Sequence, residues 1–301
     1  MPKVYDLEIA ALLIRVSRKG GIAIQDGKDP AYHTFRKVLH REKTPDISLI
    51  VDTGRIPDTG STGLLFDSNE SWTMFRRGNL YSLDFHPPEF SRPFWRAVMK
   101  QPFTEVTVYC DGSLFKNPNG IGIANPVCYP LDQILLMHYL ATRDGLIVHG
   151  AGIELKGKGY VFAGRSGAGK TTISKQFIAR GLGLLLSDDR VIIRKTDDTF
   201  RVFGTPWPGE GGFAVNRGVP LGGIFFLARN SQNMIEEIPS LTTIENLLPV
   251  VSIPWYDPEP MSGILGFCDD LIAHIPSYIF HFMPDTGAVD MFEKFISQHV
   301  T

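Results

Sequence analysis

The amino-acid sequence predicts a protein of the α/β class, α+β overall, in which a strand-rich N-terminal lobe precedes an α/β domain. Two observations predict this class. Short apolar runs alternate with turn residues through the first part of the chain, which is typical of strands. Residues 160–186 then show the order strand, glycine-rich loop, helix, strand. The chain has 301 residues, 43% hydrophobic and 21% charged, so it is long enough for two modest globular domains.

The N-terminal lobe is predicted to consist mainly of strands. Its candidate strands are residues 7–16, 47–51, 63–67, 72–76, 80–85 and 105–110. A short helix is expected at residues 94–99. Near residues 125–130 the character of the sequence changes, and apolar residues at helical spacing predict a helix over 131–141. We therefore expect two domains, 1–127 and 128–301.

In the second domain, short strands are expected at 146–150, 151–155 and 160–164, before the loop. Residues 164–171, GRSGAGKT, match the pattern G-x-x-x-x-G-K-[ST] at every fixed position. Glycines in such a loop can turn successive backbone N–H groups toward one anion. Lys170 supplies a cation and Thr171 a hydroxyl that can bind Mg²⁺. A helix predicted over 171–181 adds its free N–H groups and dipole. The residues predicted to contact phosphate are Gly164, Arg165, Ser166, Gly167, Ala168, Gly169, Lys170, Thr171 and Thr172.

Two adjacent carboxylates follow the helix and the next strand. Asp188 and Asp189 come directly after the apolar run 182–186. A short strand–helix–strand unit should place its second strand parallel to the first, so both strands end at the same edge of the sheet. Mg²⁺ prefers oxygen ligands, and phosphoryl transfer needs a group that orients or deprotonates the attacking hydroxyl. The pair is therefore predicted to lie beside the phosphates.

Charge and composition exclude several classes of protein. A net charge of −2 and scattered basic residues argue against nucleic acid as a partner. No apolar run reaches the ~18 residues that span a bilayer, so we expect no membrane association. Three widely spaced cysteines and the absence of a signal-peptide pattern favour a cytoplasmic protein. These features leave open whether the chain forms a homo-oligomer.

The residues around the loop resemble a known family. His149 ends the strand LIVHG and, if that strand neighbours YVFAG, lies near the loop. Residues 149–193, with a histidine-glycine pair, the glycine-rich loop and the aspartate pair at short spacing, resemble the catalytic core of the HPr kinase/phosphorylase family. The resemblance extends more loosely over 204–227. It implies a P-loop-containing kinase domain with a phosphoenolpyruvate carboxykinase-like fold.

The resemblance also implies roles for individual residues. It makes Asp188 the general base, and it matches His149 to the active-site histidine and Lys170 to the phosphate-contacting lysine. It places Thr171, Asp189 and Glu210 as candidate Mg²⁺ ligands, and Arg217 as a candidate for stabilising the transferred charge. ATP and Mg²⁺ are the implied cofactors.

The N-terminal lobe does not resemble the regulatory domain of HPr kinases, so the chain resembles instead the divergent HPr-kinase-related proteins found beside peptide-modification genes. That resemblance implies an ATP-dependent kinase whose acceptor is a hydroxyl, serine above all, of a peptide or small protein. The N-terminal lobe is then a hypothesis for acceptor recognition. Two other functions stay open at this point: a non-catalytic nucleotide-binding adaptor, and a kinase of a small metabolite.

Overall fold

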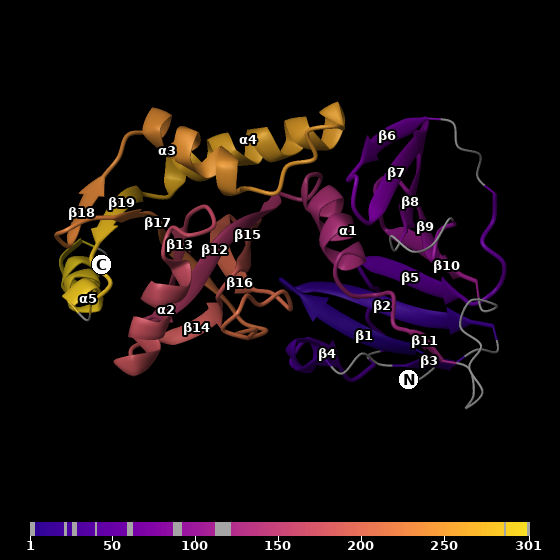
Figure 1. Ribbon diagram of the computed structural model, residues 1–301, viewed down its shortest axis with the longest axis horizontal. Helices are drawn as coiled ribbons and strands as arrows, with labels where there is room; N and C mark the ends of the chain where they lie inside the picture. Colours follow the sequence, from indigo (N-terminus) through magenta and orange to yellow (C-terminus); the bar gives the residue numbers. More distant parts are fainter. Residues whose placement is uncertain are drawn as a thin grey trace.

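The computed structural model describes residues 4–20, 23–25, 29–39, 41–58, 63–86, 92–111, 122–285 and 287–299. Over these residues the chain forms two large sheets. Figure 1 shows the two sheets side by side, with helix α1 (Leu131–Leu140) between them. None of the helices in the described ranges is both long enough and apolar enough to cross a membrane.

The N-terminal sheet is mixed. Strand β5 runs parallel to its neighbours β2 and β10, and the other pairs are antiparallel. In spatial order its strands are β4 (Arg36–Lys37), β1 (Val4–Ile9), β2 (Leu12–Lys19), β5 (Ile47–Asp52), β10 (Glu105–Cys110), β9 (Trp95–Lys100), β8 (Leu80–Phe85), β7 (Trp72–Arg77) and β6 (Leu64–Asp67). Two short parallel strands, β3 (Ala23–Gln25) and β11 (Gly122–Ala124), and a 3-10 helix (Pro30–Tyr32) complete this half.

The first predicted strand, 7–16, is a hairpin. Strands β1 and β2 pair with each other through a tight turn at Ala10 and Ala11, whose φ angles are 54° and 58°. Turns of this hand favour glycine or asparagine, and neither residue is present to mark the turn in the sequence. A buried apolar environment holds Ala10, which is 0% exposed.

The predicted helix at 94–99 is wrong, because strand β9 begins at Trp95 and runs to Lys100. Trp95, Ala97 and Met99 are buried and alternate with less buried residues, which is the period of a strand. Strands β8 and β10 pair with β9 on its two sides. The tryptophan at the start of the segment therefore belongs to the core of the sheet.

The C-terminal sheet has a closed ring of strand pairs. Strands β12, β15, β16, β17 and β13 pair in that order, and β13 pairs again with β12. Strands β19 and β18 extend the sheet from β17. The strands are β12 (Gly145–Leu155), β13 (Lys158–Ala163), β14 (Leu184–Ser187), β15 (Arg190–Thr196), β16 (Thr199–Gly204), β17 (Gly218–Arg229), β18 (Met234–Glu237) and β19 (Ser277–Phe282).

Helices cover this sheet in two groups. Buried side chains of α2 (Lys170–Ala179) pack in one apolar cluster with α5 (Gly287–His299). Those of α4 (Pro258–His274) form a second cluster with α3 (Ser240–Leu247) and a 3-10 helix (Leu248–Val250). Figure 1 shows α4 along one border of the molecule and α2 beside β12.

The hydrophobic core of the N-terminal sheet extends into the C-terminal half. Helix α1 contributes six buried apolar side chains to the cluster that also contains the N-terminal sheet: Leu131, Ile134, Leu135, Leu136, Tyr139 and Leu140. Ile147, Ile192, Phe203 and Trp207, from the C-terminal half, belong to the same cluster. The helix expected at 131–141 is confirmed, but it packs with the lobe that precedes residue 128.

Strand β12 organises the region of the predicted site. The expected strands 146–150 and 151–155 are one continuous strand, and β13 and β14 pair antiparallel with it on opposite edges. β13 and β14 therefore run parallel to each other in one sheet with β12 between them, which confirms the expected strand direction. Gly150 pairs with Ala163, so His149 lies next to the end of β13, where the glycine-rich loop begins.

Candidate phosphate-binding site

The glycine-rich loop connects the end of β13 to the start of α2. Gly167 and Gly169 have φ angles of 82° and 110°, a region that favours glycine. A Cβ atom on Gly169 would also lie 2.3 Å from Cζ of Phe282, at the end of β19. The loop is therefore turned tightly over the end of the sheet, and α2 begins at Lys170 directly after it.

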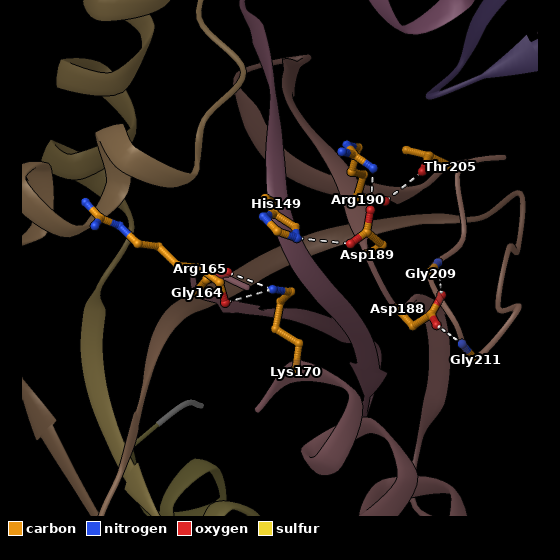
Figure 2. Close-up of polar contacts among 10 residues, drawn as sticks. All are labelled: His149, Gly164, Arg165, Lys170, Asp188, Asp189, Arg190, Thr205, Gly209 and Gly211. Carbon is orange, nitrogen blue, oxygen red and sulfur yellow. Dashed lines mark hydrogen bonds and ion pairs between the residues drawn. The ribbon is translucent and has the colours of Figure 1, made fainter. Parts of the chain in front are cut away.

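Lys170 is buried inside this loop. The residue is 8% exposed, and Nζ donates to the carbonyl oxygens of Gly164 at 2.8 Å and Arg165 at 3.2 Å. Burial lowers the pKa of Lys170, while the carboxylate of Asp189 opposes this shift. Figure 2 shows the ammonium group between the loop and Asp189. A phosphate that enters the loop would replace carbonyl oxygens as the acceptor of these N–H groups.

The two aspartates interrupt an otherwise continuous strand. β14 ends at Ser187 and β15 begins at Arg190, and both pair antiparallel with the same edge of β12. Between them, the N–H of Gly150 donates to the carbonyl oxygen of Asp189. Successive side chains along an extended chain point in opposite directions. The interruption therefore sends Asp188 and Asp189 to different neighbours.

Asp188 is held by the loop after β16. Its Oδ1 accepts a hydrogen bond from the N–H of Gly209 at 2.9 Å, and its Oδ2 accepts one from Gly211 at 2.7 Å. The residue is only 4% exposed. A Cβ atom on Gly211 would lie 2.5 Å from Oδ2, so only glycine lets the backbone approach this closely. Two backbone N–H groups thus fix the orientation of the carboxylate.

Asp189 lies between a histidine and an arginine. Its Oδ1 is 3.0 Å from Nε2 of His149, and its Oδ2 accepts from the guanidinium of Arg190. Burial raises the pKa of Asp189, but the hydrogen bond with His149 and the charges of Arg190, His149 and Lys170 outweigh it. The pKa of Asp189 therefore lies below its ordinary value, and the carboxylate is ionised at neutral pH.

A cavity of about 310 Å³ joins these groups. It brings together ten of the residues singled out in the sequence: His149, Ser166, Gly167, Gly169, Lys170, Thr171, Thr172, Asp188, Asp189 and Glu210. Gly164, Arg165 and Ala168 belong to the loop but do not line the cavity. Gly164 and Arg165 instead hold the ammonium of Lys170 through their carbonyl groups.

Arg217 is the sequence-based candidate for stabilising the transferred charge, but a different arginine, Arg229, lies at the cavity. Arg217 is engaged in a bidentate ion pair with Glu154 of β12, at 2.5 and 2.6 Å, and does not line the cavity. Arg229, which the sequence analysis missed, does line it. It ends β17, whose direction is that of β13, so its side chain starts from the same edge as the loop. Within the described ranges, no ion pair engages Arg229.

The oxygen donors around the cavity suit Mg²⁺, which takes one or two carboxylates together with phosphate oxygens. Thr171, Asp189 and Glu210 all line it, and Glu210 is exposed to solvent. Within the described ranges, no cluster of three or more His, Cys, Asp or Glu side chains could hold a metal ion.

The fold and the site define a mixed α/β protein with a glycine-rich strand–loop–helix unit and a carboxylate pair beside it. Residues 130–248, less than half of the chain, match the family model described as SynChlorMet cassette protein ScmC. No curated protein matches the chain. Among solved structures, it is similar to the HPr(Ser) kinase/phosphatase from Coxiella burnetii at 13% identity and a TM-score of 0.31, over 51% of this chain and 95% of that one.

Proposed function

We propose that this protein is an ATP- and Mg²⁺-dependent kinase that phosphorylates a hydroxyl group, serine above all, of a peptide or small protein. One observation carries the proposal: Lys170, Thr171, Asp188 and Asp189 line a single cavity at the start of α2. Phosphoryl transfer needs a cation and N–H donors for the phosphates, a metal ligand, and a group that accepts the proton of the attacking hydroxyl. Residues of each of these chemical types line this cavity, which supports the proposal.

Asp188 is the best candidate for the base. Each of its oxygens accepts one backbone N–H and retains a second lone pair. In the proposed step, the acceptor oxygen forms a bond to the terminal phosphorus of ATP while the bond from that phosphorus to the bridging oxygen breaks. The hydroxyl proton passes to Asp188, and ADP leaves with the electron pair of the broken bond. The two N–H groups keep the carboxylate in one orientation throughout, which reduces the cost of positioning.

The remaining groups are proposed to bind the phosphates and Mg²⁺ and to balance the negative charge of the phosphates. Lys170 and Arg229 are the cations available to the phosphates, and the N–H groups at the start of α2 add to them. Thr171 and Asp189 are the candidate ligands for Mg²⁺, which when bound would neutralise charge on the phosphate oxygens, and Glu210 lies at the exposed side. His149 orients Asp189 through the hydrogen bond between them.

The direct test is transfer of labelled phosphate. The protein is incubated with Mg²⁺ and ATP labelled in its terminal phosphate, together with the small proteins and peptides encoded beside its gene. We expect a labelled serine in one of them, located by mass spectrometry. Nucleotide binding without transfer to any acceptor would favour the adaptor function. Label that appears only in a free small molecule would favour a metabolite kinase.

A further inference from the structure

A second cavity, of about 470 Å³, lies between the two halves of the chain. Tyr32 and Arg36 line it from the part of the chain before residue 128, and Arg190, Trp207 and Pro208 from the part after it, with Cys128 at the junction. We call it the seam cavity. It is separate from the phosphate cavity and is not used by the roles assigned above.

Two aromatic side chains give the seam cavity an apolar wall. Oη of Tyr32 donates to Oδ2 of the buried Asp132 at 2.6 Å, and Nε1 of Trp207 donates to the same oxygen at 3.1 Å. The Oη of Tyr32 also accepts from the N–H of Tyr129. The polar atoms of both rings are therefore already hydrogen-bonded within the protein. A ligand in the cavity would contact the apolar surfaces of the rings. Such walls bind apolar and aromatic side chains.

Two arginines give the seam cavity N–H donors for an anionic ligand, and one of them, Arg190, also pairs with Asp189. Arg36 and Arg190 both line the cavity, against one carboxylate, Asp29. That carboxylate accepts a hydrogen bond from the N–H of Ala31, where it caps a 3-10 helix. Two guanidinium groups beside an aromatic wall fit a carboxylate next to an apolar side chain.

The seam cavity shares a wall with the phosphate cavity. Arg190 lines the seam cavity and donates to Asp189, which lines the phosphate cavity. Pro208 lines the seam cavity, and the next residue, Gly209, lines the phosphate cavity and holds Asp188. A peptide spans about 3.3–3.6 Å per residue. Pro208 and Gly209 are consecutive, so the linings of the two cavities adjoin there within about one such residue length.

We propose that the seam cavity binds the acceptor peptide, taking an aromatic or other apolar side chain with an adjacent carboxylate while the serine lies over the shared wall. This proposal rests on the proposed kinase function, because it names the acceptor of that reaction. It makes an acidic, aromatic-containing peptide the substrate class. Specificity would then come from both halves of the chain at once.

Cys128 provides a test that needs no catalysis. It is half-buried in the seam cavity, whereas Cys110 and Cys268 are buried elsewhere. Burial raises the pKa of Cys128 to about 12, so its reaction with N-ethylmaleimide is slow and can be followed by mass spectrometry. The probe is a library of N-acetylated nonapeptides with a central serine and varied flanking residues. The full chain is used without nucleotide.

We expect peptides that carry an aromatic residue beside Asp or Glu to slow the labelling of Cys128 about tenfold at ten times their Kd. Arg36→Gln should weaken binding of these peptides about tenfold, since a charge-assisted hydrogen bond is lost. The matched control Arg41→Gln changes an exposed arginine outside the cavity and should have no effect. Retention of the aromatic preference in Arg36→Gln would show that the variant is folded.

Two results would overturn the proposal: that no peptide protects Cys128, or that ATP alone protects it, which would give the cavity to the nucleotide. Phosphorylation of a library peptide that gives no protection would reject the seam cavity and leave the kinase function standing. Protection by acidic aromatic peptides without any phosphate transfer would support the peptide site and refute the kinase function.

Discussion

Lys170 carries the phosphate-binding hypothesis at the scale of one residue. Its ammonium is already buried among loop carbonyl groups, so a phosphate meets a desolvated cation. We expect Lys170→Ala to weaken binding of Mg-ATP about tenfold to a hundredfold, the effect of losing a hydrogen bond to a charged group, and to abolish transfer. Titration calorimetry measures the affinity. The control Lys294→Ala, on the exposed face of α5, should bind like the wild type.

The variant Asp188→Asn distinguishes the binding of Mg-ATP from the transfer of its phosphate. Asp188→Asn removes the proposed proton acceptor, so turnover should fall by about two to four decades while affinity for Mg-ATP changes little. The hydrogen bonds of Asp188 predict a second effect, on stability. Both oxygens accept backbone N–H groups, and the amide of asparagine would set a donor against one of them. A thermal melt should therefore show a small loss of stability. Full activity in this variant would assign the base to another residue.

The loop at 208–212 orients the carboxylate of Asp188, the proposed base, and a change at Gly211 tests this role without removing the carboxylate. A Cβ atom at Gly211 would meet Oδ2 of Asp188 at 2.5 Å, so Gly211→Ala must displace either the carboxylate or the loop. We expect turnover to fall at least about tenfold, in line with the cost of misplacing a catalytic group, with ATP affinity nearly unchanged. The control Gly266→Ala, in α4 with nothing near its Cβ, should leave turnover unchanged. Unaltered kinetics in Gly211→Ala would separate this loop from catalysis.

Elements with a strong local signal were predictable from the sequence. The loop, the helix after it and the strands on either side follow from glycine placement and from apolar period, which act over a few residues. The site residues missed or misplaced depend on contacts between distant segments. Arg229 reaches the cavity because β17 runs parallel to β13, and Arg217 is drawn away by Glu154. No spacing rule encodes either pairing.

The boundary between the two halves of the chain also depends on contacts between distant segments, which sequence patterns do not predict. The change in composition near residue 127 predicts a boundary, but the apolar side chains of α1 pack with strands that precede it. Buried polar contacts also cross it. Asp257 accepts hydrogen bonds from Arg76 at 2.6 Å and Tyr81 at 2.7 Å, and Asp132 joins Tyr32 to Trp207. Helix α1 packs against residues from both halves, and a local change in composition cannot predict such packing.

The buried Asp132, which lies between the two halves, makes the stability of the protein depend on pH. Burial raises the pKa of Asp132 to about 6, against the lowering effect of its hydrogen bonds with Tyr32 and Trp207. Between about pH 4 and pH 6 the folded protein therefore binds more protons at this site than the unfolded chain, so the site's contribution to stability falls as pH rises through this window. We expect Asp132→Asn to flatten the dependence of the unfolding free energy on pH there. Denaturant melts at several pH values measure it, and an unchanged slope would contradict this assignment.

A fragment that begins at Pro126 tests whether the C-terminal half is a domain in its own right. It would contain the glycine-rich loop, both aspartates and His149, and so every group of the phosphate cavity. It would also expose the six apolar side chains of α1 and leave the buried carboxylate of Asp257 without Arg76 and Tyr81. Exposed apolar surface of this kind favours aggregation. We expect the fragment to be insoluble or to melt without a cooperative transition, and to recover solubility when residues 1–125 are co-expressed. Circular dichroism melts and gel filtration measure this, and a soluble fragment with a cooperative melt would mean that α1 stabilises the C-terminal half independently of the sheet it packs against.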